Sequence, residues 1–300
     1  MQVKKKNTLN VLVLGATGML GHAVYRVLSK DPHLNVFGTA RSPSQSAAFP
    51  KALTKNLIFH TDVENYDSLI GAFEKAKPDV VINCVGIIKQ LADSGDALKT
   101  VPLNTLLPHR LALLTKLCGA RLILVSTDCV FSGSKGDYTE TDYPDCNDLY
   151  GRSKLLGEIT DSQHVLTIRT SIIGHEIRGG LSLVDWFLSQ DESVSGYSNV
   201  IFSGLPTNEL AQIIQNLILN HKQLHGLYHV SANPINKYAL LQLIAKTYNK
   251  KIKILESKKI KMNRSLSHSK FKKDAGYKSK DWKSLVESMH QFYLSNLDIK

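Results

Sequence analysis

A chain of 300 residues, 43% hydrophobic and 21% charged, is long enough to bury a large core and has the composition of a globular protein. No apolar run approaches the roughly 20 residues of a membrane-spanning helix, so we expect no membrane insertion. The formal net charge is +11 and is concentrated in residues 246–283, which hold 13 Lys and one Arg against three acidic residues. This stretch suits an anionic ligand or a solvated surface, and without a nucleic-acid-binding motif we expect no nucleic-acid partner.

The N-terminus resembles a secretory signal only in part. Lys4-Lys5-Lys6 precede an apolar run, but Gly15, Thr17 and Gly18 interrupt it, and cleavage there would remove a glycine motif. We therefore expect mature sequence and a cytoplasmic protein. Four cysteines lack any metal-binding spacing, which predicts reduced thiols and no metal site: Cys84, Cys118, Cys129 and Cys146.

A glycine-rich turn follows the first predicted strand, residues 9–14. Gly15, Gly18 and Gly21 are spaced by three, and a helical pattern follows them. Such a turn brings a backbone without Cβ atoms, and free helix-terminal amides, to the pyrophosphate of a dinucleotide. A turn that binds nothing is the alternative, which the strand before it and the helix after it disfavour. The predicted cofactor residues are Gly15, Thr17, Gly18, Met19 and Leu20.

The second predicted strand, residues 35–39, leads to Arg41. Enzymes that prefer NAD usually carry Asp or Glu about 20 residues past the glycine motif, where it holds the ribose 2′-hydroxyl. Here Gly38-Thr39-Ala40 contain no acid and Arg41 is basic. This combination predicts that NADP(H) is preferred over NAD(H); an exposed loop arginine without a role is the alternative.

Strands and helices alternate through the middle of the chain. We predict strands at 57–60, 80–86, 122–125 and 165–170, and helices at 66–75 and 104–117. This alternation is typical of an α/β protein with a doubly wound parallel sheet of the Rossmann type. A smaller α/β substrate lobe would be interleaved with it. A helix over 207–220, begun and capped by Pro206-Thr207, would pack back on the sheet.

These elements divide the chain into two parts. The Rossmann domain would span residues 1–172, with 203–222 packing back onto it. The substrate lobe would take residues 173–202 and 223–300. That lobe is predicted to contain a short strand at 227–230 and helices at 238–248 and 282–294.

Three polar groups follow the fifth predicted strand and could meet. The apolar run ends at Ser126-Thr127-Asp128, and Tyr150 and Lys154 are four residues apart on a predicted helix. Residues four apart share a helix face, and open α/β sheets place their chemistry at the carboxyl ends of strands. Thr127, Tyr150 and Lys154 could therefore converge on one substrate oxygen. In the alternative interpretation, Thr127 only caps the end of the strand, and Tyr150 and Lys154 are surface side chains without a catalytic role.

With these motifs, the chain resembles the extended short-chain dehydrogenases/reductases, and among them the dTDP-4-dehydrorhamnose reductase group. The resemblance implies that Thr127 hydrogen-bonds the substrate carbonyl, Tyr150 is the catalytic acid and Lys154 binds the nicotinamide ribose. A neighbouring ammonium would lower the pKa of the tyrosine. The matching segments are residues 15–21, 62–63, 83, 126–133, 150–154 and 169–171.

The same resemblance implies further binding residues. Asp62 and Val63 would lie beside the adenine, and Asn83, followed by Cys84 and Val85, on the strand that lines the cofactor. Asn104 corresponds to a helix asparagine that supports the lysine through water. Substrate contacts are predicted for Asn104, Thr127, Asp128 and Arg264. The Arg264 segment departs from the Arg-Pro-x-x-Ser form of the reductases, so an unengaged loop arginine is its alternative.

Differences from related enzymes narrow the reaction. The resemblance implies that dehydratases of this superfamily carry Thr-Asp-Glu at the positions where this chain has Thr127-Asp128-Cys129. The missing Glu disfavours dehydration. The resemblance also implies that epimerases retain a tightly bound NAD. Arg41, with no acidic residue nearby, disfavours NAD and therefore disfavours an epimerase. We therefore expect NADPH-dependent reduction of a 4-keto nucleotide sugar, so the partner would be a nucleotide-diphosphate sugar, and a homodimer is the assembly we consider. A regulatory subunit resembling the β subunit of methionine adenosyltransferase, or a nucleotide-sugar epimerase, is the alternative.

Overall fold

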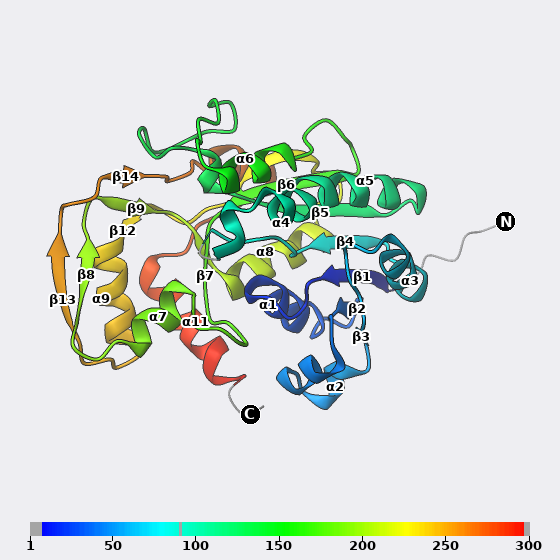
Figure 1. Ribbon diagram of the computed structural model, residues 1–300, viewed down its shortest axis with the longest axis horizontal. Helices are drawn as coiled ribbons and strands as arrows, with labels where there is room; N and C mark the ends of the chain where they lie inside the picture. The colour runs from blue at the N-terminus through cyan, green and yellow to red at the C-terminus, as the bar shows by residue number, and fades with distance from the viewer. Residues whose placement is uncertain (1–7, 90–91, 297–300) are drawn as a thin grey trace.

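A seven-stranded parallel sheet forms the centre of the larger half of the molecule (Figure 1). The computed structural model describes residues 8–89 and 92–296, so Lys4-Lys5-Lys6 lie outside the described residues. Its strands are β1 (Leu9–Leu14), β2 (Leu34–Thr39), β3 (Leu57–Ile58), β4 (Val80–Asn83), β5 (Arg121–Thr127), β6 (Val165–Thr170) and β11 (Gly226–His229). The order β11-β6-β5-β4-β1-β2-β3 reverses between β1 and β4, the place where open α/β sheets bind ligands. The predicted Rossmann-type fold is confirmed.

Helices cover both faces of this sheet. Side chains alternate along β1, so Val11 and Val13 pack with α1 (Met19–Leu28) and α8 (Thr207–Leu219) in one apolar cluster. Leu12 and Leu14 point the other way, into a cluster with α3 (Tyr66–Ala76) and α5 (Leu107–Leu117). Apolar side chains on both faces explain why the strands read as continuous hydrophobic runs.

The helix predicted to start at residue 104 begins earlier in the structure. α4 (Ala97–Val101) continues through a π-helical turn, Pro102–Leu106, into α5. Proline is tolerated at the start of a helix, and a π turn widens the hydrogen-bonding pattern around the missing N–H. The predicted cap of α8 is also corrected, because Pro206 occupies the N-cap and no side chain caps that helix.

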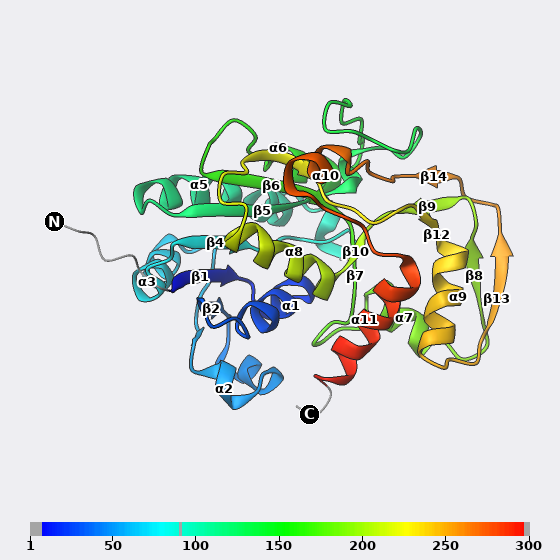
Figure 2. The same cartoon turned by 180° about the vertical axis from the view of Figure 1, so that it is seen from behind.

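The second lobe is built from short sheets and helices at one end of the molecule (Figures 1 and 2). β8 (Ser193–Tyr197) pairs with β13 (Lys253–Ser257), and β9 (Val200–Phe202) lies between β12 (Ile235–Asn236) and β14 (Met262–Asn263). β7 (Ile172–Ile173) and β10 (Leu205–Pro206) connect this lobe to the large sheet. Its helices are α7 (Leu183–Ser189), α9 (Lys237–Thr247) and α11 (Trp282–Leu294). In contrast, α10 (Ser269–Ala275) packs on β11 of the large sheet, and the large half adds α2 (Lys51–Thr54) and α6 (Leu149–Leu156).

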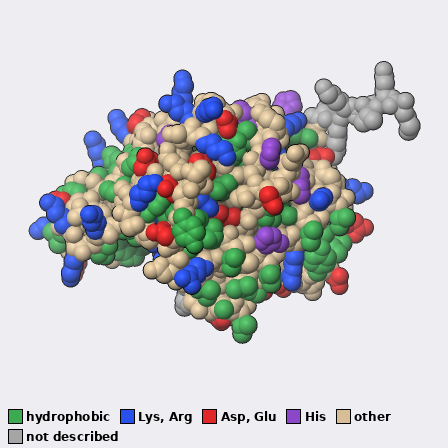
Figure 3. Space-filling model, turned by 90° about the horizontal axis from the view of Figure 1, so that it is seen from above, with side chains coloured by type: hydrophobic (Ala, Val, Ile, Leu, Met, Phe, Trp, Pro, Cys, Tyr) green, Lys and Arg blue, Asp and Glu red, His purple; other side chains and the backbone are tan. Residues whose placement is uncertain are grey.

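The surface of the second lobe is basic. Lys and Arg side chains gather at the end of the molecule where β13 and α9 lie (Figure 3). Within residues 8–89 and 92–296, no helix is long and apolar enough to cross a membrane, and no group of three His, Cys, Asp or Glu side chains could hold a metal ion. The four cysteines are free thiols.

Candidate functional site

The glycine turn after β1 is closely packed and leaves amides exposed to a ligand. Gly15 has φ +75°, and a Cβ on it would lie 2.8 Å from Cγ2 of Val85. A Cβ on Gly21 would lie 1.9 Å from the carbonyl oxygen of Gly15. Gly18 is the N-cap of α1 and makes no side-chain cap, so the amides of Met19 and the residues after it have no side-chain acceptor. This turn fits the pyrophosphate of a dinucleotide.

The residues predicted beside the adenine end of the cofactor lie at the same sheet edge. Arg41 follows β2 and is exposed, and its backbone N–H donates to Oε1 of Gln45 at 3.0 Å. Among the described residues its guanidinium has no hydrogen bond or ion pair. Asp62 is exposed and its carboxylate accepts the backbone N–H of Glu64, while Val63 is half-buried beside it. Arg41 is therefore available to a phosphate.

The segment after β4 forms the wall beside the glycine turn. Asn83 is 5% exposed, and its Oδ1 accepts the backbone N–H of Val85 at 3.1 Å. The N–H of Cys84 donates to the carbonyl of Leu14 at 3.1 Å. Burial raises the pKa of the Cys84 thiol to about 12, so this thiol is neutral. The backbone here is fixed against the turn in which the dinucleotide is predicted to bind.

The structure brings together the three predicted catalytic side chains. Thr127 ends β5, and its hydroxyl accepts the N–H of Cys129 at 3.1 Å and donates to Oδ1 of Asp128 at 3.3 Å. This hydroxyl is close enough to the Tyr150 phenol to affect the pKa of that phenol. Tyr150 and Lys154 lie on α6, which begins at Asp148, whose Oδ1 accepts the N–H of Gly151 at 2.8 Å. Nζ of Lys154 donates to the carbonyl of Val125 at 2.8 Å, so the helix reaches back to β5.

The pKa of Tyr150 differs from the expected direction. Burial raises the pKa of this phenol, the charge of Cys129 also raises it, and the nearby Thr127 hydroxyl only partly offsets these two effects. Lys154 is not among the largest influences on this pKa; its ammonium donates to the Val125 carbonyl and interacts electrostatically with Glu158. Burial lowers the pKa of Lys154 to about 8, against the raising effect of Glu158. The expected depression of the tyrosine pKa is corrected.

A buried ion pair under α6 was missed from the sequence. Nη2 of Arg169 on β6 lies 2.7 Å from Oε2 of Glu158, and both side chains are 4% exposed. The Ser126 hydroxyl donates to the same carboxylate at 2.6 Å. The signals were a charged residue in the apolar strand 165–170 and a Glu one helical turn after Lys154. The pair fixes the end of α6 to β5 and β6.

Asn104 is more deeply buried than we expect of a residue that contacts a substrate. Its side chain is 1% exposed, and Oδ1 accepts the N–H of Ile87 at 3.0 Å. Its Nδ2 donates to the carbonyl of Ile87 at 3.2 Å and to Oγ of Ser153 at 3.3 Å. The π turn that carries Asn104 therefore joins the segment after β4 to the helix that carries Tyr150.

Asp128 and Arg264 interact electrostatically beside the segment that follows Thr127. Asp128 is 6% exposed, and burial raises the pKa of its carboxyl against the opposing charge of Arg264. Nε of Arg264 donates to the carbonyl of Phe131 at 2.8 Å, and Nη1 lies 3.5 Å from Sγ of Cys129. The arginine is therefore engaged with the segment after β5, and this segment continues from Thr127.

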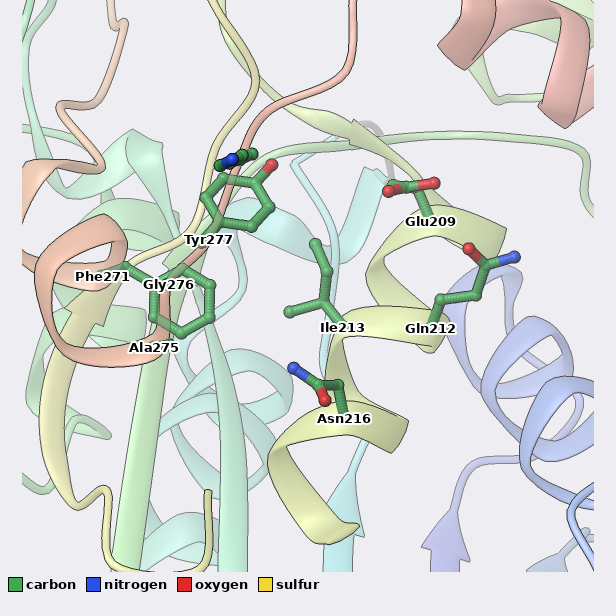
Figure 4. Close-up of a pocket in the computed structure, with 9 residues that line it drawn as sticks. Glu209, Gln212, Ile213, Asn216, Phe271, Ala275, Gly276 and Tyr277 are labelled. Carbon is green, nitrogen blue, oxygen red and sulfur yellow. The ribbon is translucent and has the colours of Figure 1, made fainter. Parts of the chain in front are cut away.

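A hollow lies away from these residues, between α8 and α10 (Figure 4). Ile213, Phe271 and Tyr277 line it, and Glu209 at its edge is ion-paired with Lys280 at 2.7 Å. None of the predicted site residues lines it. The candidate active site is therefore the region at the carboxyl ends of β1, β4 and β5.

The fold and this site define a class. A Rossmann-type sheet with a glycine turn after β1 and a Thr, Tyr and Lys set after β5 is the arrangement of the extended short-chain dehydrogenases/reductases. Within that class, the chain belongs to the family described as the RmlD substrate binding domain, whose model matches residues 9–294.

Curated relatives include proteins with different names. The chain is 30% identical to methionine adenosyltransferase 2 subunit beta of Danio rerio over 252 residues, which is 80% of this chain and 74% of the relative. It is also 30% identical, over 235 residues, to the spore coat polysaccharide biosynthesis protein SpsK of Bacillus subtilis, covering 75% of this chain and 74% of that protein.

Solved structures share the fold at lower identity. A dTDP-4-dehydrorhamnose reductase from Bacillus anthracis, in complex with NADP, superposes with a TM-score of 0.77 at 21% identity, covering 95% of this chain and 99% of that one. The enzyme WbmG of Bordetella bronchiseptica, in complex with NAD and UDP, gives a TM-score of 0.79 at 18% identity, covering 100% and 99%.

Proposed function

We propose that this protein is a cytoplasmic, NADPH-dependent reductase that acts on the 4-keto group of a nucleotide sugar. The observation that carries the proposal is the meeting of Thr127, Tyr150 and Lys154 at the carboxyl end of β5, next to the wall of the glycine turn. The dTDP-4-dehydrorhamnose reductase crystallised with NADP, which has the same fold, supports it.

The chain's own residues account for the proton side of such a reduction. The nicotinamide, when bound, supplies hydride to the keto carbon. Tyr150 gives a proton to the developing alkoxide, and Thr127 donates a second hydrogen bond to the same oxygen. Since burial raises the pKa of Tyr150, the phenol keeps its proton at neutral pH. A protonated phenol is the form that a reduction needs. Lys154 would hold the ribose hydroxyls.

The preference for NADP(H) is proposed from Arg41. Its exposed guanidinium follows β2, where the strand edge faces the ribose of a dinucleotide bound at the glycine turn. A guanidinium can bind a 2′-phosphate with two parallel hydrogen bonds. Asp62 lies one strand further on and is engaged by the N–H of Glu64, so it does not take the place of the missing acid.

A screen of NADPH oxidation against a panel of 4-keto nucleotide sugars tests the proposal. We expect turnover with at least one sugar and more efficient use of NADPH than of NADH. Tyr150→Phe should lower kcat by about 10²–10⁴, the usual contribution of a positioned proton donor, with NADPH affinity unchanged. Tyr143→Phe is the matched control, because Tyr143 is 84% exposed. Full turnover in Tyr150→Phe would refute the mechanism.

A second function is favoured by the relatives. The similarity to methionine adenosyltransferase 2 subunit beta suggests a regulatory binding partner of a synthetase. The intact set of Thr127, Tyr150 and Lys154 speaks for catalysis instead. Copurification with a methionine adenosyltransferase, together with no NADPH oxidation on any sugar of the panel, would establish the regulatory role over the reductase.

A further inference from the structure

The end of the second lobe carries a surface of lysines that the candidate active site does not use. It is formed by the end of α9, by β13 and by the chain that runs on to β14, and we call it the lysine surface (Figure 3). None of the residues predicted for the active site belongs to it, and all of its lysines except Lys250 are exposed. Its seven lysines are Lys246, Lys250, Lys251, Lys253, Lys258, Lys259 and Lys261.

Neighbouring acids do not balance the positive charge of the lysine surface. Residues 191–202 and 235–263, which build this end of the lobe, contain three acidic side chains: Asp191, Glu192 and Glu256. Lys250 forms an ion pair with Asp191 at 3.2 Å. Among residues 8–89 and 92–296, the other six ammonium groups of the surface have no ion pair and no hydrogen bond. On the adjacent α11, Glu287 is paired with Lys283 of the same helix. The surface therefore has an excess of positive charge.

One face of the sheet formed by β8 and β13 is exposed within this surface. β13 is the outermost strand at that end of the molecule (Figure 1). Val194 and Ile254 pack with the apolar residues of α9, on the other face of the sheet. Because side chains alternate along a strand, Lys253 and Leu255 point to the exposed face, where they lie opposite Ser193 and Ser195. The strands place no acidic side chain on this face.

The kinds of side chain on the lysine surface favour an anionic lipid as its partner. Clusters of lysines are attracted to anionic headgroups, and aliphatic side chains among them can enter the headgroup layer. Leu255 and Ile260 are such side chains, since they are 45% and 46% exposed. The surface has no arginine and no exposed aromatic side chain among its described residues. Protein interfaces are enriched in both and depleted of lysine, and single-stranded nucleic acids stack their bases on aromatic rings.

We propose that the lysine surface docks this protein on an anionic lipid bilayer, with Leu255 and Ile260 entering the headgroup layer. The contact is peripheral, because it needs no segment that crosses the membrane. Attraction between exposed charges acts over about 8 Å at physiological salt, so the lysines must lie close to the headgroups. The inference goes beyond the proposed function and applies equally to a reductase and to a regulatory subunit.

Co-sedimentation with lipid vesicles tests this inference. Vesicles of phosphatidylcholine that contain phosphatidylglycerol are compared with vesicles of phosphatidylcholine alone, and we expect at least tenfold tighter binding to the anionic vesicles. Raising the salt from about 0.1 M to about 1 M should release the protein, since it shortens the Debye length from about 10 Å to about 3 Å. The combined change Lys253→Gln, Lys258→Gln and Lys259→Gln should weaken binding at least tenfold, because each lysine near the membrane contributes roughly fivefold.

A matched variant removes the same charge from the large half of the molecule. Lys51 and Lys55 at α2 and Lys75 on α3 are exposed, and changing all three to Gln should leave vesicle binding unchanged. Leu255→Ser keeps the charge and should weaken binding to anionic vesicles by about three- to tenfold, because it removes the aliphatic contact. Melting temperatures and circular dichroism report whether each variant is folded.

Three results would overturn the inference. The first is a wild type that does not bind anionic vesicles at about 0.1 M salt. The second is a folded triple variant of the lysine surface that binds them within twofold of the wild type. The third uses soluble polyglutamate as a competitor: if it displaces the protein and Leu255→Ser binds vesicles as tightly as the wild type, the surface fits an acidic protein instead. These measurements need no turnover, so failure of the reductase proposal leaves them unaffected.

Discussion

At the scale of single residues, Lys154 combines its proposed function with a cost in stability. Its ammonium is half-buried and its pKa is lowered to about 8, from an ordinary value near 10.4 in an unfolded chain. Below pH 8 both states are protonated, and the native state bears the full cost of the buried charge. Between these pKa values the unfolded state binds more protons, so this cost shrinks as pH rises.

Lys154→Met should therefore be more stable than the wild type at pH 7, by an upper bound of roughly 3 kcal/mol. Losing the hydrogen bond to Val125 reduces the gain by about 1 kcal/mol. The difference should diminish toward pH 10, and urea unfolding of the cofactor-free protein at pH 7 to 10 measures it. Lys75→Met on α3, where the lysine is exposed, should show no such trend. A constant difference across this range would contradict the buried-charge explanation.

The sequence located this site better than it described its electrostatics. The spacing of Thr127, Tyr150 and Lys154 was sufficient to predict that they meet, because a strand end and one helix face are local features. The pKa of Tyr150 was mispredicted, because it depends on how deeply the phenol is buried.

At the scale of elements, the glycine turn between β1 and α1 is so closely packed that a substitution in it tests whether the turn binds a dinucleotide. A Cβ at Gly21 would lie 1.9 Å from the carbonyl of Gly15, so Gly21→Ala must open the turn. We expect a loss of about 1–3 kcal/mol in stability and at least a tenfold loss of NADPH affinity, measured by urea unfolding and fluorescence titration. Gly71→Ala on α3 is the control, because no atom lies within 4 Å of its Cβ. The free energy of unfolding of Gly71→Ala should rise by about 0.5–1 kcal/mol, and this variant should bind NADPH normally. If Gly21→Ala also binds NADPH normally, the glycine turn is not part of the cofactor site.

Helices and strands with a clear hydrophobic pattern could be predicted from the sequence, whereas the residues at which they begin and end were harder to predict. The strands β1, β2 and β6 were found nearly to the residue, since their apolar runs are bounded by turn signals. The helix around Asn104 was started too late, because Pro102 reads as a break in an α-helix and only the π turn accommodates it. Such a turn depends on tertiary contacts, here those of Asn104 with Ile87 and Ser153.

At the scale of the whole molecule, an exposed apolar stripe suggests a second copy of the chain as partner. Leu106, Leu113 and Leu117 lie at helical spacing on the segment that ends in α5, and are 43%, 63% and 83% exposed. Leu156 at the end of α6 is 63% exposed, and its carbonyl lies 2.8 Å from Nε2 of His109 on α5. Exposed patches of this kind commonly mark protein interfaces.

We propose a homodimer through this stripe. Leu113→Lys with Leu117→Lys should convert the protein to a monomer in light scattering and leave NADPH binding intact. Ile260→Lys, at a residue 46% exposed in the second lobe, should not change the mass. A wild-type mass of one chain would contradict the proposal, as would a dimer that survives the double substitution.

The interleaving of the two lobes also sets the order in which the site can assemble. The segment that carries Arg264 is joined to the region after β5 by a β-bridge between Tyr138 and Leu266. The chain after α11 reaches α1, where Arg26 donates a hydrogen bond to Asn296. These contacts span more than a hundred residues, and long-range contacts form late because closing a long loop costs entropy. A nascent chain that has reached residue 230 contains the glycine turn and Tyr150, but not Arg264. The half proposed to bind the dinucleotide is thus synthesised before the half proposed to bind the substrate.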